Sequence, residues 1–180
     1  GVALSRTDCA PQLMLSKDQL TVTGEKGFRM VRATAGASEG AWYFEVLVLP
    51  PARADGHVRI GWSTGAGDLQ APVGYDRHSY AYRDLAGSRV HASLRHDGYG
   101  APYGPGDVVG AQIVLAGPSD PSGAPTSAIR FFVNGVDQGV AYTALAPAAY
   151  LPAVSLYMGA RVRVNFGPRF VCAPPPLRAE

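Results

Sequence analysis

The sequence has little charge, little lysine and no long apolar run. Charged residues make up 17% of its 180 residues, and only two of the 16 basic residues are lysines, Lys17 and Lys26. The formal net charge of +2 is too small for the whole chain to bind nucleic acid by charge alone. The longest aliphatic stretch, Val46–Leu49, is too short to cross a membrane. These features argue against a strongly basic chain, a membrane-spanning chain and a disordered chain.

Catalytic and metal-binding motifs are also missing. The sequence holds no G-x-S-x-G, H-E-x-x-H, C-x-x-C or phosphate-loop motif. His91 and His96 are five residues apart in a stretch typical of a strand and turn, which is not metal-site spacing. Cys9 and Cys172 lie near opposite ends; one disulfide would fit a secreted protein, but two unpaired thiols are the simpler interpretation. We therefore expect no metal site and no cofactor.

The sequence does have a clear period of two, which is the strand period. Apolar residues alternate in four segments: Trp42, Phe44, Val46 and Val48; Val109, Ala111, Ile113 and Leu115; Ile129, Phe131 and Val133; and Val162, Val164 and Phe166. Asn134–Gly135 follows one such run and supplies the positive φ angles of a tight hairpin turn. The 22 glycines and 15 prolines disfavour long helices. The pattern predicts a single all-β domain, either a sandwich or a barrel.

The stretch Arg77–His96 combines basic and aromatic side chains. Its arginines are Arg77, Arg83, Arg89 and Arg95, its one acid is Asp84, and its tyrosines are Tyr80 and Tyr82, with Tyr75 just before it. Arginine forks bind carboxylates and tyrosine rings add rigid contact area, so the cluster suits an acidic peptide. Bases stacked on tyrosine beside arginine would suit nucleic acid in the same way. A solvated loop whose arginines cover apolar surface explains the pattern equally well.

A second basic set lies near the end of the chain and consists of Arg161, Arg163 and Arg169, with no acid nearby in the sequence. We expect it to decorate the outer face of the last strand. We interpret the set as an exposed face that protects a sheet edge from aggregation. A nucleosomal DNA contact through these three arginines is the less favoured hypothesis.

Several ordered segments together resemble the SPRY domain, a bent, jelly-roll-like (concanavalin-like) sandwich of two antiparallel sheets. They are AWYFEV, RIGWS, GDVVGAQIVL, AIRFFVNGVDQGVAY and YLPAVSLYMGARVRVNFGP. Within that family, LTVTGEKGFRMVRA and LQAPVGYDRHSYAYRD resemble the Ash-type branch (absent, small or homeotic discs; Trauco in plants). Proteins of this branch are subunits of COMPASS and MLL histone H3 lysine 4 methyltransferase complexes.

The resemblance implies how the chain is divided and what it does. It implies a SPRY domain at 10–171 with an N-terminal flank at 1–9 before it. The composition of 116–127 predicts a flexible loop, and the prolines of 172–180 predict a tail. In the family, the domain is a non-catalytic nuclear scaffold without a membrane partner. It binds an acidic segment of the WD-repeat subunit of the retinoblastoma-binding type, and the pair stimulates the SET-domain catalytic subunit. The helix that binds the dumpy-thirty-type dimer has no counterpart here, so we do not expect that partner.

The family's binding pocket is basic and aromatic, and its residues carry over to positions that match its motifs. Its two arginines correspond to Arg59 in HVRIGW and Arg83 in SYAYRD, and its apolar wall corresponds to Pro72 and Tyr75 in APVGYD. Phe28 stands where animal members have a tyrosine after GEKG, which keeps the ring and loses a hydroxyl group. The resemblance and the residue pattern therefore point to the same region.

Two other functions also fit a β-sandwich. A SPRY adaptor that delivers substrates to a ubiquitin ligase would bind a short neutral or asparagine-rich peptide. That function does not explain the presence of the GEKG and QAPVGYD motifs. A carbohydrate-binding or hydrolytic sandwich needs exposed tryptophan or paired carboxylates, for which Asp76, Asp84 and Asp97 are the scattered candidates. Trp42 and Trp62 lie in strand patterns, so we expect both in the core rather than at a sugar site.

Overall fold

The computed structural model describes residues 1–117 and 127–172, which form two seven-stranded sheets. In spatial order, the first sheet contains β1 (Leu4–Cys9), β4 (Arg29–Ala33), β13 (Leu151–Tyr157), β6 (His57–Ser63), β7 (Ser79–Arg83), β8 (Arg89–His91) and β9 (Leu94–His96). The second contains β12 (Val136–Thr143), β11 (Ala128–Val133), β10 (Val108–Leu115), β5 (Gly40–Leu49), β14 (Ala160–Asn165), β3 (Thr21–Gly24) and β2 (Met14–Leu15). A short 3-10 helix, η1, spans Leu85–Gly87.

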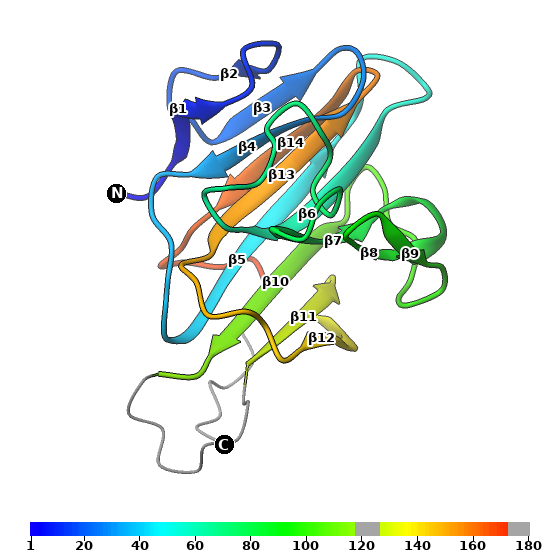
Figure 1. Cartoon of the computed structure of the whole chain (residues 1–180). Coiled ribbons are helices and arrows are strands. Elements are labelled where there is room, and N and C mark those ends of the chain that lie inside the picture. The colour runs from blue at the N-terminus through cyan, green and yellow to red at the C-terminus, as the bar shows by residue number, and fades with distance from the viewer. Residues whose placement is uncertain (118–126, 173–180) are drawn as a thin grey trace.

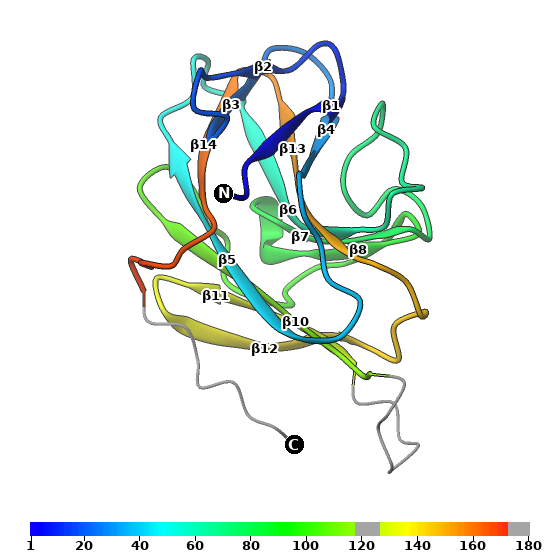
Figure 2. The same ribbon diagram turned by 90° about the vertical axis from the view of Figure 1, so that its left-hand side faces the viewer.

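The two sheets form two layers, as Figure 2 shows, and neighbouring strands within each sheet run antiparallel. This confirms the prediction of a single all-β domain built as a sandwich of two antiparallel sheets. Within the part of the chain that the structure describes, no helix is long and apolar enough to cross a membrane. Most of the predicted loop 116–127 and of the predicted tail 172–180 lies outside the described residues.

The side chains between the sheets follow the two-residue period. Val109, Ala111 and Ile113 of β10 are completely buried. Phe44 of β5 packs edge-on against Trp62 of β6, with ring centroids 5.1 Å apart, and so joins the two sheets. Burial of such apolar side chains is the main favourable contribution to folding.

The prediction that Trp42 lies in the core is wrong. Its side chain is 52% exposed, and its Nε1 donates a hydrogen bond to the Glu39 carbonyl oxygen at 2.7 Å. Trp42 shares a strand face with Phe44 but lies closer to the end of β5, where the opposite sheet does not cover it. The argument against a carbohydrate-binding sandwich that relied on two buried tryptophans therefore no longer holds.

Asn134 and Gly135 form the predicted tight turn between β11 and β12. Their φ angles are 50° and 83°, in the left-handed region that such a turn requires. The Asn134 side chain accepts a hydrogen bond from the Val108 N–H at 2.9 Å and donates one to Asp107 Oδ1 at 2.9 Å. These bonds tie the turn to the start of β10, and the predicted hairpin is confirmed.

The loop between β6 and β7, residues 64–78, lies across the outer face of the first sheet (Figure 1). Leu69 and Val73 of this loop pack on a small cluster formed by Met30, Ala81, Val90 and Ala153. The Met30 N–H donates to the Leu69 carbonyl at 2.9 Å, and the Val73 N–H donates to Ser155 Oγ at 3.0 Å. The loop is thus fixed to the sheet although it contains no strand.

Arg32 of β4 anchors the start of this loop. The side chain is 3% exposed, and its Nε and Nη2 donate to the Asp8 carboxylate at 2.8 and 2.7 Å. Its Nη1 donates to the Gly67 carbonyl at 2.7 Å. Asp8 belongs to β1, which pairs with β4 although its residues fall in the predicted flank 1–9. The position of the loop therefore depends on strand β1.

Candidate functional site

Arg59 of β6 and Arg83 of β7 lie directly opposite each other in the antiparallel ladder. Their strand neighbours Ile60 and Tyr82 are buried in the core, so the alternation of side chains directs both arginines to the outer face. Neither arginine forms an ion pair within the described ranges, and the Nε atom of each is buried without a hydrogen-bond partner. Two like charges side by side favour an anion that contacts both.

Three aromatic rings continue this face beside Arg59. The Arg59 Cζ atom lies 4.9 Å from the Phe28 ring centroid, and Phe28 stacks on Tyr157 with centroids 5.1 Å apart. Tyr157 in turn lies 6.2 Å from the His57 ring, nearly parallel to it. Tyr157 and His57 are absent from the predicted site. The alternation in β13, which places Tyr157 on the same face as Ser155, is the signal that would have identified Tyr157.

Pro72 and Tyr75 reach the site from the loop that crosses this face. The Tyr75 N–H donates to the Pro72 carbonyl at 3.1 Å and closes a turn, and Tyr75 is 51% exposed. The Val73 carbonyl oxygen between them lies 3.5 Å from Arg59 Nη1. Ser93 Oγ donates to the Tyr75 carbonyl at 2.6 Å and ties the turn to the β8–β9 hairpin. The structure therefore brings the loop turn and Arg59 together.

The electrostatics of the site favour an anionic ligand. Burial, together with the neighbouring charges of Arg83 and Arg95, lowers the pKa of Arg59 to about 10. A lowered pKa means that the free domain disfavours the charged guanidinium at this position. A carboxylate placed against the pair would offset both the lost hydration and the repulsion between the two arginines.

The acid that follows Arg83 in the sequence is engaged elsewhere. Asp84 Oδ2 lies 3.1 Å from His57 Nδ1, and Oδ1 accepts a hydrogen bond from the Leu85 N–H at 2.8 Å. Burial raises the pKa of Asp84, and its hydrogen bond with His57 opposes part of that rise. Asp84 therefore caps η1 and orients His57, and it forms no ion pair with Arg83.

The prediction that Tyr80 and Tyr82 offer ring surface beside the arginines is wrong. They are 7% and 0% exposed, because they occupy the inner face of β7 while Arg83 occupies the outer face. Tyr80 stacks on His91 with centroids 3.9 Å apart, and the Tyr82 hydroxyl donates to the Ala101 carbonyl. The aromatic part of the site comes instead from Phe28 and its neighbours.

One expectation about the C-terminal arginines is wrong. No acid is near Arg163 in the sequence, but in the fold its Nη2 donates to Asp18 Oδ2 at 2.9 Å. Strand β14, which carries Arg161 and Arg163, lies between β5 and β3 and is not a sheet edge. Protection of an edge therefore does not explain these arginines. A DNA contact through them and Arg169 stays a hypothesis.

The described residues include the groups of an anion-binding site. No cluster of three or more His, Cys, Asp or Glu side chains that could hold a metal ion occurs in residues 1–117 and 127–172. Cys9 and Cys172 are free thiols, and burial raises the pKa of each. The arrangement of two outward arginines, an aromatic row and an exposed tyrosine is suited to holding carboxylates and an adjoining apolar group.

Comparison with known proteins identifies the family. A family model described as the SPRY domain matches residues 41–169. The chain is 36% identical over 207 residues to the Set1/Ash2 histone methyltransferase complex subunit ASH2 of Drosophila melanogaster, with 94% of this chain and 36% of that protein covered. It is 31% identical over 214 residues to subunit ash-2 of Caenorhabditis elegans, with 94% and 37% covered. The chain thus spans about a third of the length of these curated relatives.

The solved structures agree on the fold. The SPRY domain of human HERC1 superimposes with a TM-score of 0.75 at 16% sequence identity, and the match covers 93% of this chain and 100% of that one. Identity at this level shows the fold alone. The similarity to the two Ash2 subunits confirms the predicted resemblance to the Ash-type branch, and the family model covers well over half of the residues. The chain therefore belongs to the SPRY domain family.

Proposed function

We propose that this SPRY domain is a non-catalytic interaction module that binds an acidic peptide segment through Arg59 and Arg83. The observation that carries the proposal is the unneutralised pair itself: two arginines face each other on an outer sheet face, and neither has a carboxylate partner in the described ranges. In the proposed pocket, Phe28 contacts Arg59, and Pro72 and Tyr75 flank Val73, whose carbonyl oxygen lies 3.5 Å from Arg59 Nη1.

The proposed partner is the acidic segment of the WD-repeat subunit of the retinoblastoma-binding type. Similarity to Ash2 subunits of Set1/Ash2 histone methyltransferase complexes supports this choice. The domain then acts in the nucleus as a subunit of a complex that methylates lysine 4 of histone H3. The docked pair of subunits favours the active arrangement of the SET domain, and this domain supplies no reacting group.

The binding energy comes from charge-assisted hydrogen bonds in a partly dry site. Each forked contact between an arginine and a carboxylate contributes about 1.5–3 kcal/mol. Arg59 contributes more per contact than a fully hydrated arginine because its neighbourhood is buried, so less water must be displaced when the ligand arrives. The exposed Tyr75 adds contact area at the rim.

Calorimetric titration of the chain with the acidic segment tests the proposal. We expect saturable binding that Arg83→Ala weakens at least tenfold, which corresponds to about 1.4 kcal/mol, and that rising salt weakens further. Arg130→Ala is the matched control, because Arg130 lies on β11 of the other sheet and pairs with Asp137.

Two results would contradict the proposal. One is the absence of binding by the folded chain, which would leave the ubiquitin-ligase adaptor as the better hypothesis. The other is equal weakening by Arg83→Ala and Arg130→Ala, since this would mean that overall charge, and not the pair, attracts the peptide.

A further inference from the structure

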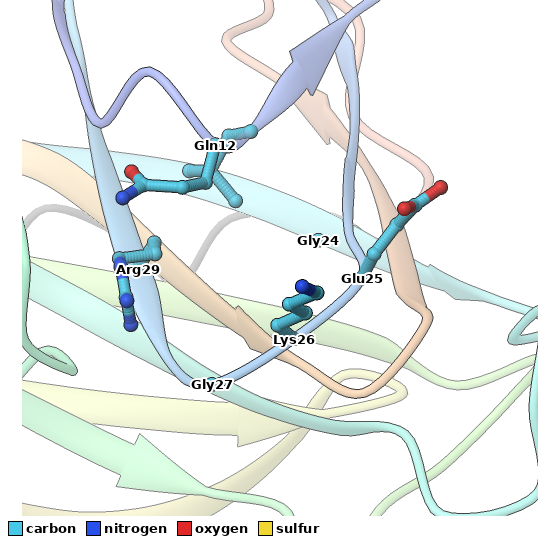
Figure 3. A pocket seen from close by; sticks show the side chains of 7 residues that line it. Gln12, Gly24, Glu25, Lys26, Gly27 and Arg29 are labelled. Carbon is cyan, nitrogen blue, oxygen red and sulfur yellow. The ribbon is translucent and has the colours of Figure 1, made fainter.

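A hollow lies beside the proposed pocket, at the turn that joins β3 to β4. Its volume is about 250 Å³, and it is lined by Gln12, Leu13, Gly24, Glu25, Lys26, Gly27 and Arg29. The turn contains the GEKG motif, which the Arg59–Arg83 pocket does not use. Figure 3 shows the Lys26 side chain extending toward Gly24. Arg29 and Gln12 lie on the other side of the hollow, and the Glu25 carboxylate is directed away from these residues. Lys26 and Arg29 are thus the cations of the hollow, and Glu25 is the acid in its lining.

The backbone of this turn is held rigidly. The Met158 N–H donates to the Lys26 carbonyl at 2.7 Å, and the Gly159 N–H donates to the Gly24 carbonyl at 2.7 Å. A Cβ atom on Gly24 would lie 2.8 Å from the Leu156 Cβ atom, so a glycine is needed for this close approach. The turn is thus a fixed platform that presents Lys26, and it does not have to be ordered by the ligand.

Arg29 is the second cation of the hollow and is only partly satisfied. Its Nη1 donates to the Phe28 carbonyl at 2.9 Å, but its Nε is buried without a hydrogen-bond partner. It forms no ion pair in the described part of the chain. Lys26 is exposed and equally unpaired there. Two unneutralised cations at one hollow favour an anionic group.

The hollow adjoins the proposed pocket at Phe28, which does not itself line the hollow. This residue stands between Gly27 and Arg29 in the sequence and carries the Arg59 guanidinium on its ring. Met30 and Arg59 lie in one row of the sheet, two strands apart through Ser155. Arg29 precedes Met30 in β4, and strands are spaced about 4.8 Å apart, so the backbone positions of Arg29 and Arg59 are separated by about 10 Å, or roughly three residues of an extended peptide.

We propose that the hollow formed by Lys26 and Arg29 is a second acidic subsite for the same partner segment. This inference rests on the proposed function. An acidic side chain about three residues from the acid held by Arg59 and Arg83 lies across Phe28 and places its carboxylate between Lys26 and Arg29. The GEKG turn then sets the spacing of acids that the domain prefers, and not only the strength of binding.

Nucleic acid fits this hollow less well than a peptide carboxylate does. The hollow is the size of a side chain and is partly lined by Leu13 and the Gln12 amide. The Gln12 amide is also tied to Gln70 by reciprocal hydrogen bonds of 2.9 and 3.1 Å, which joins the hollow to the loop that carries Pro72.

A mutant cycle between the domain and a synthetic acidic peptide tests the inference. One peptide carries the acidic cluster and a glutamate three residues away, and the second carries glutamine at that position. We expect Lys26→Ala to weaken binding of the first peptide about two- to fivefold, the range for one exposed charge pair, and to leave the second unchanged. Lys17→Ala, which removes the other lysine of the chain, is the matched control.

The outcomes separate this inference from the proposed function. If Arg83→Ala weakens binding but Lys26→Ala and Lys17→Ala behave alike with both peptides, the second subsite is wrong and the pocket stands. If Arg83→Ala has no effect, the pocket itself is wrong. If Lys26→Ala lowers affinity for a DNA duplex and leaves both peptides unchanged, the hollow is a nucleic-acid contact and the peptide subsite is overturned.

Discussion

Arg59 and Arg83 are Cα partners in the β6–β7 ladder, and each has a buried Nε atom without a hydrogen-bond partner. Opposite charges at such positions stabilise a sheet, whereas like charges directly opposite each other destabilise it. The free domain therefore retains an unfavourable contact that an acidic ligand can remove. The same two charges therefore lower the stability of the free domain and raise its affinity for an acidic ligand.

Replacement of Arg83 by glutamine should expose this opposition. Arg83→Gln keeps much of the side-chain length and removes one of the two like charges, so we expect the free energy of unfolding to rise by about 0.2–1 kcal/mol. Affinity for the acidic segment should fall in the same variant. Urea unfolding at low salt measures the first effect, and titration measures the second. A loss of stability would show that packing of the Arg83 stem outweighs the repulsion.

Asp84 should contribute measurably to the pH dependence of the free energy of unfolding. Because burial raises its pKa above the ordinary value of 3.8, the folded state binds this proton more tightly than the unfolded state does. The contribution of Asp84 to stability therefore falls as pH rises from about 3.8 through its raised folded value. Most paired carboxylates have the opposite sign.

Comparison with Asp84→Asn isolates this contribution. Urea unfolding of both proteins between pH 4 and pH 7 should show the native chain losing stability relative to Asp84→Asn as pH increases. The variant keeps a side-chain oxygen for the Leu85 N–H, so the cap of η1 is retained. A difference in unfolding free energy that grows in favour of the native chain with pH would contradict the prediction.

Much of the fold follows from the two-residue period, because burial on one strand face leaves a direct pattern in the sequence. Phe44, Val46 and Ile113 lie in the core as that pattern predicts. The period does not tell where a sheet stops covering its partner, and this is why it predicts Trp42, on the same face as Phe44, in the core although the side chain is exposed. The turn at Asn134 is predictable because its positive φ needs a particular residue type.

The candidate site is harder to predict because its parts come from separate elements. Alternation distinguishes Arg83 from the buried Tyr82 only once the strand Ser79–Arg83 is known. Pro72 reaches Arg59 through a loop without periodicity, held by the buried Arg32. The resemblance to the SPRY domain, and not the period, is what identifies Arg83 and Pro72 as candidate binding residues. The period places Tyr157 on the outer face of β13, but it does not show that the ring stacks beside Phe28.

The two tryptophans should differ strongly in their contribution to stability. Trp62 is 2% exposed and packs on Phe44, so Trp62→Ala should lower the free energy of unfolding by about 3–5 kcal/mol. Trp42→Ala should cost about 1 kcal/mol or less, because half of its side chain is already hydrated. Denaturant unfolding measures both, and the native fluorescence of Trp62→Ala should report a hydrated indole. Equal costs would mean that Trp42 is covered in solution.

Removal of the Asp8 charge should weaken binding from a distance. Asp8→Asn leaves Arg32, which is 3% exposed, without its carboxylate. Loss of one partner of a buried pair costs about 3–5 kcal/mol, and we expect about 2–3 kcal/mol here because Asp8 itself is partly exposed. The loop 64–78 loses its anchor, so its amides should exchange faster and the acidic segment should bind more weakly. Asp18→Asn is the matched control, since it breaks the surface pair with Arg163 and should leave stability nearly unchanged. Unchanged exchange in the loop, with normal affinity, would show that Leu69 and Val73 alone hold the loop and that β1 is dispensable for the site.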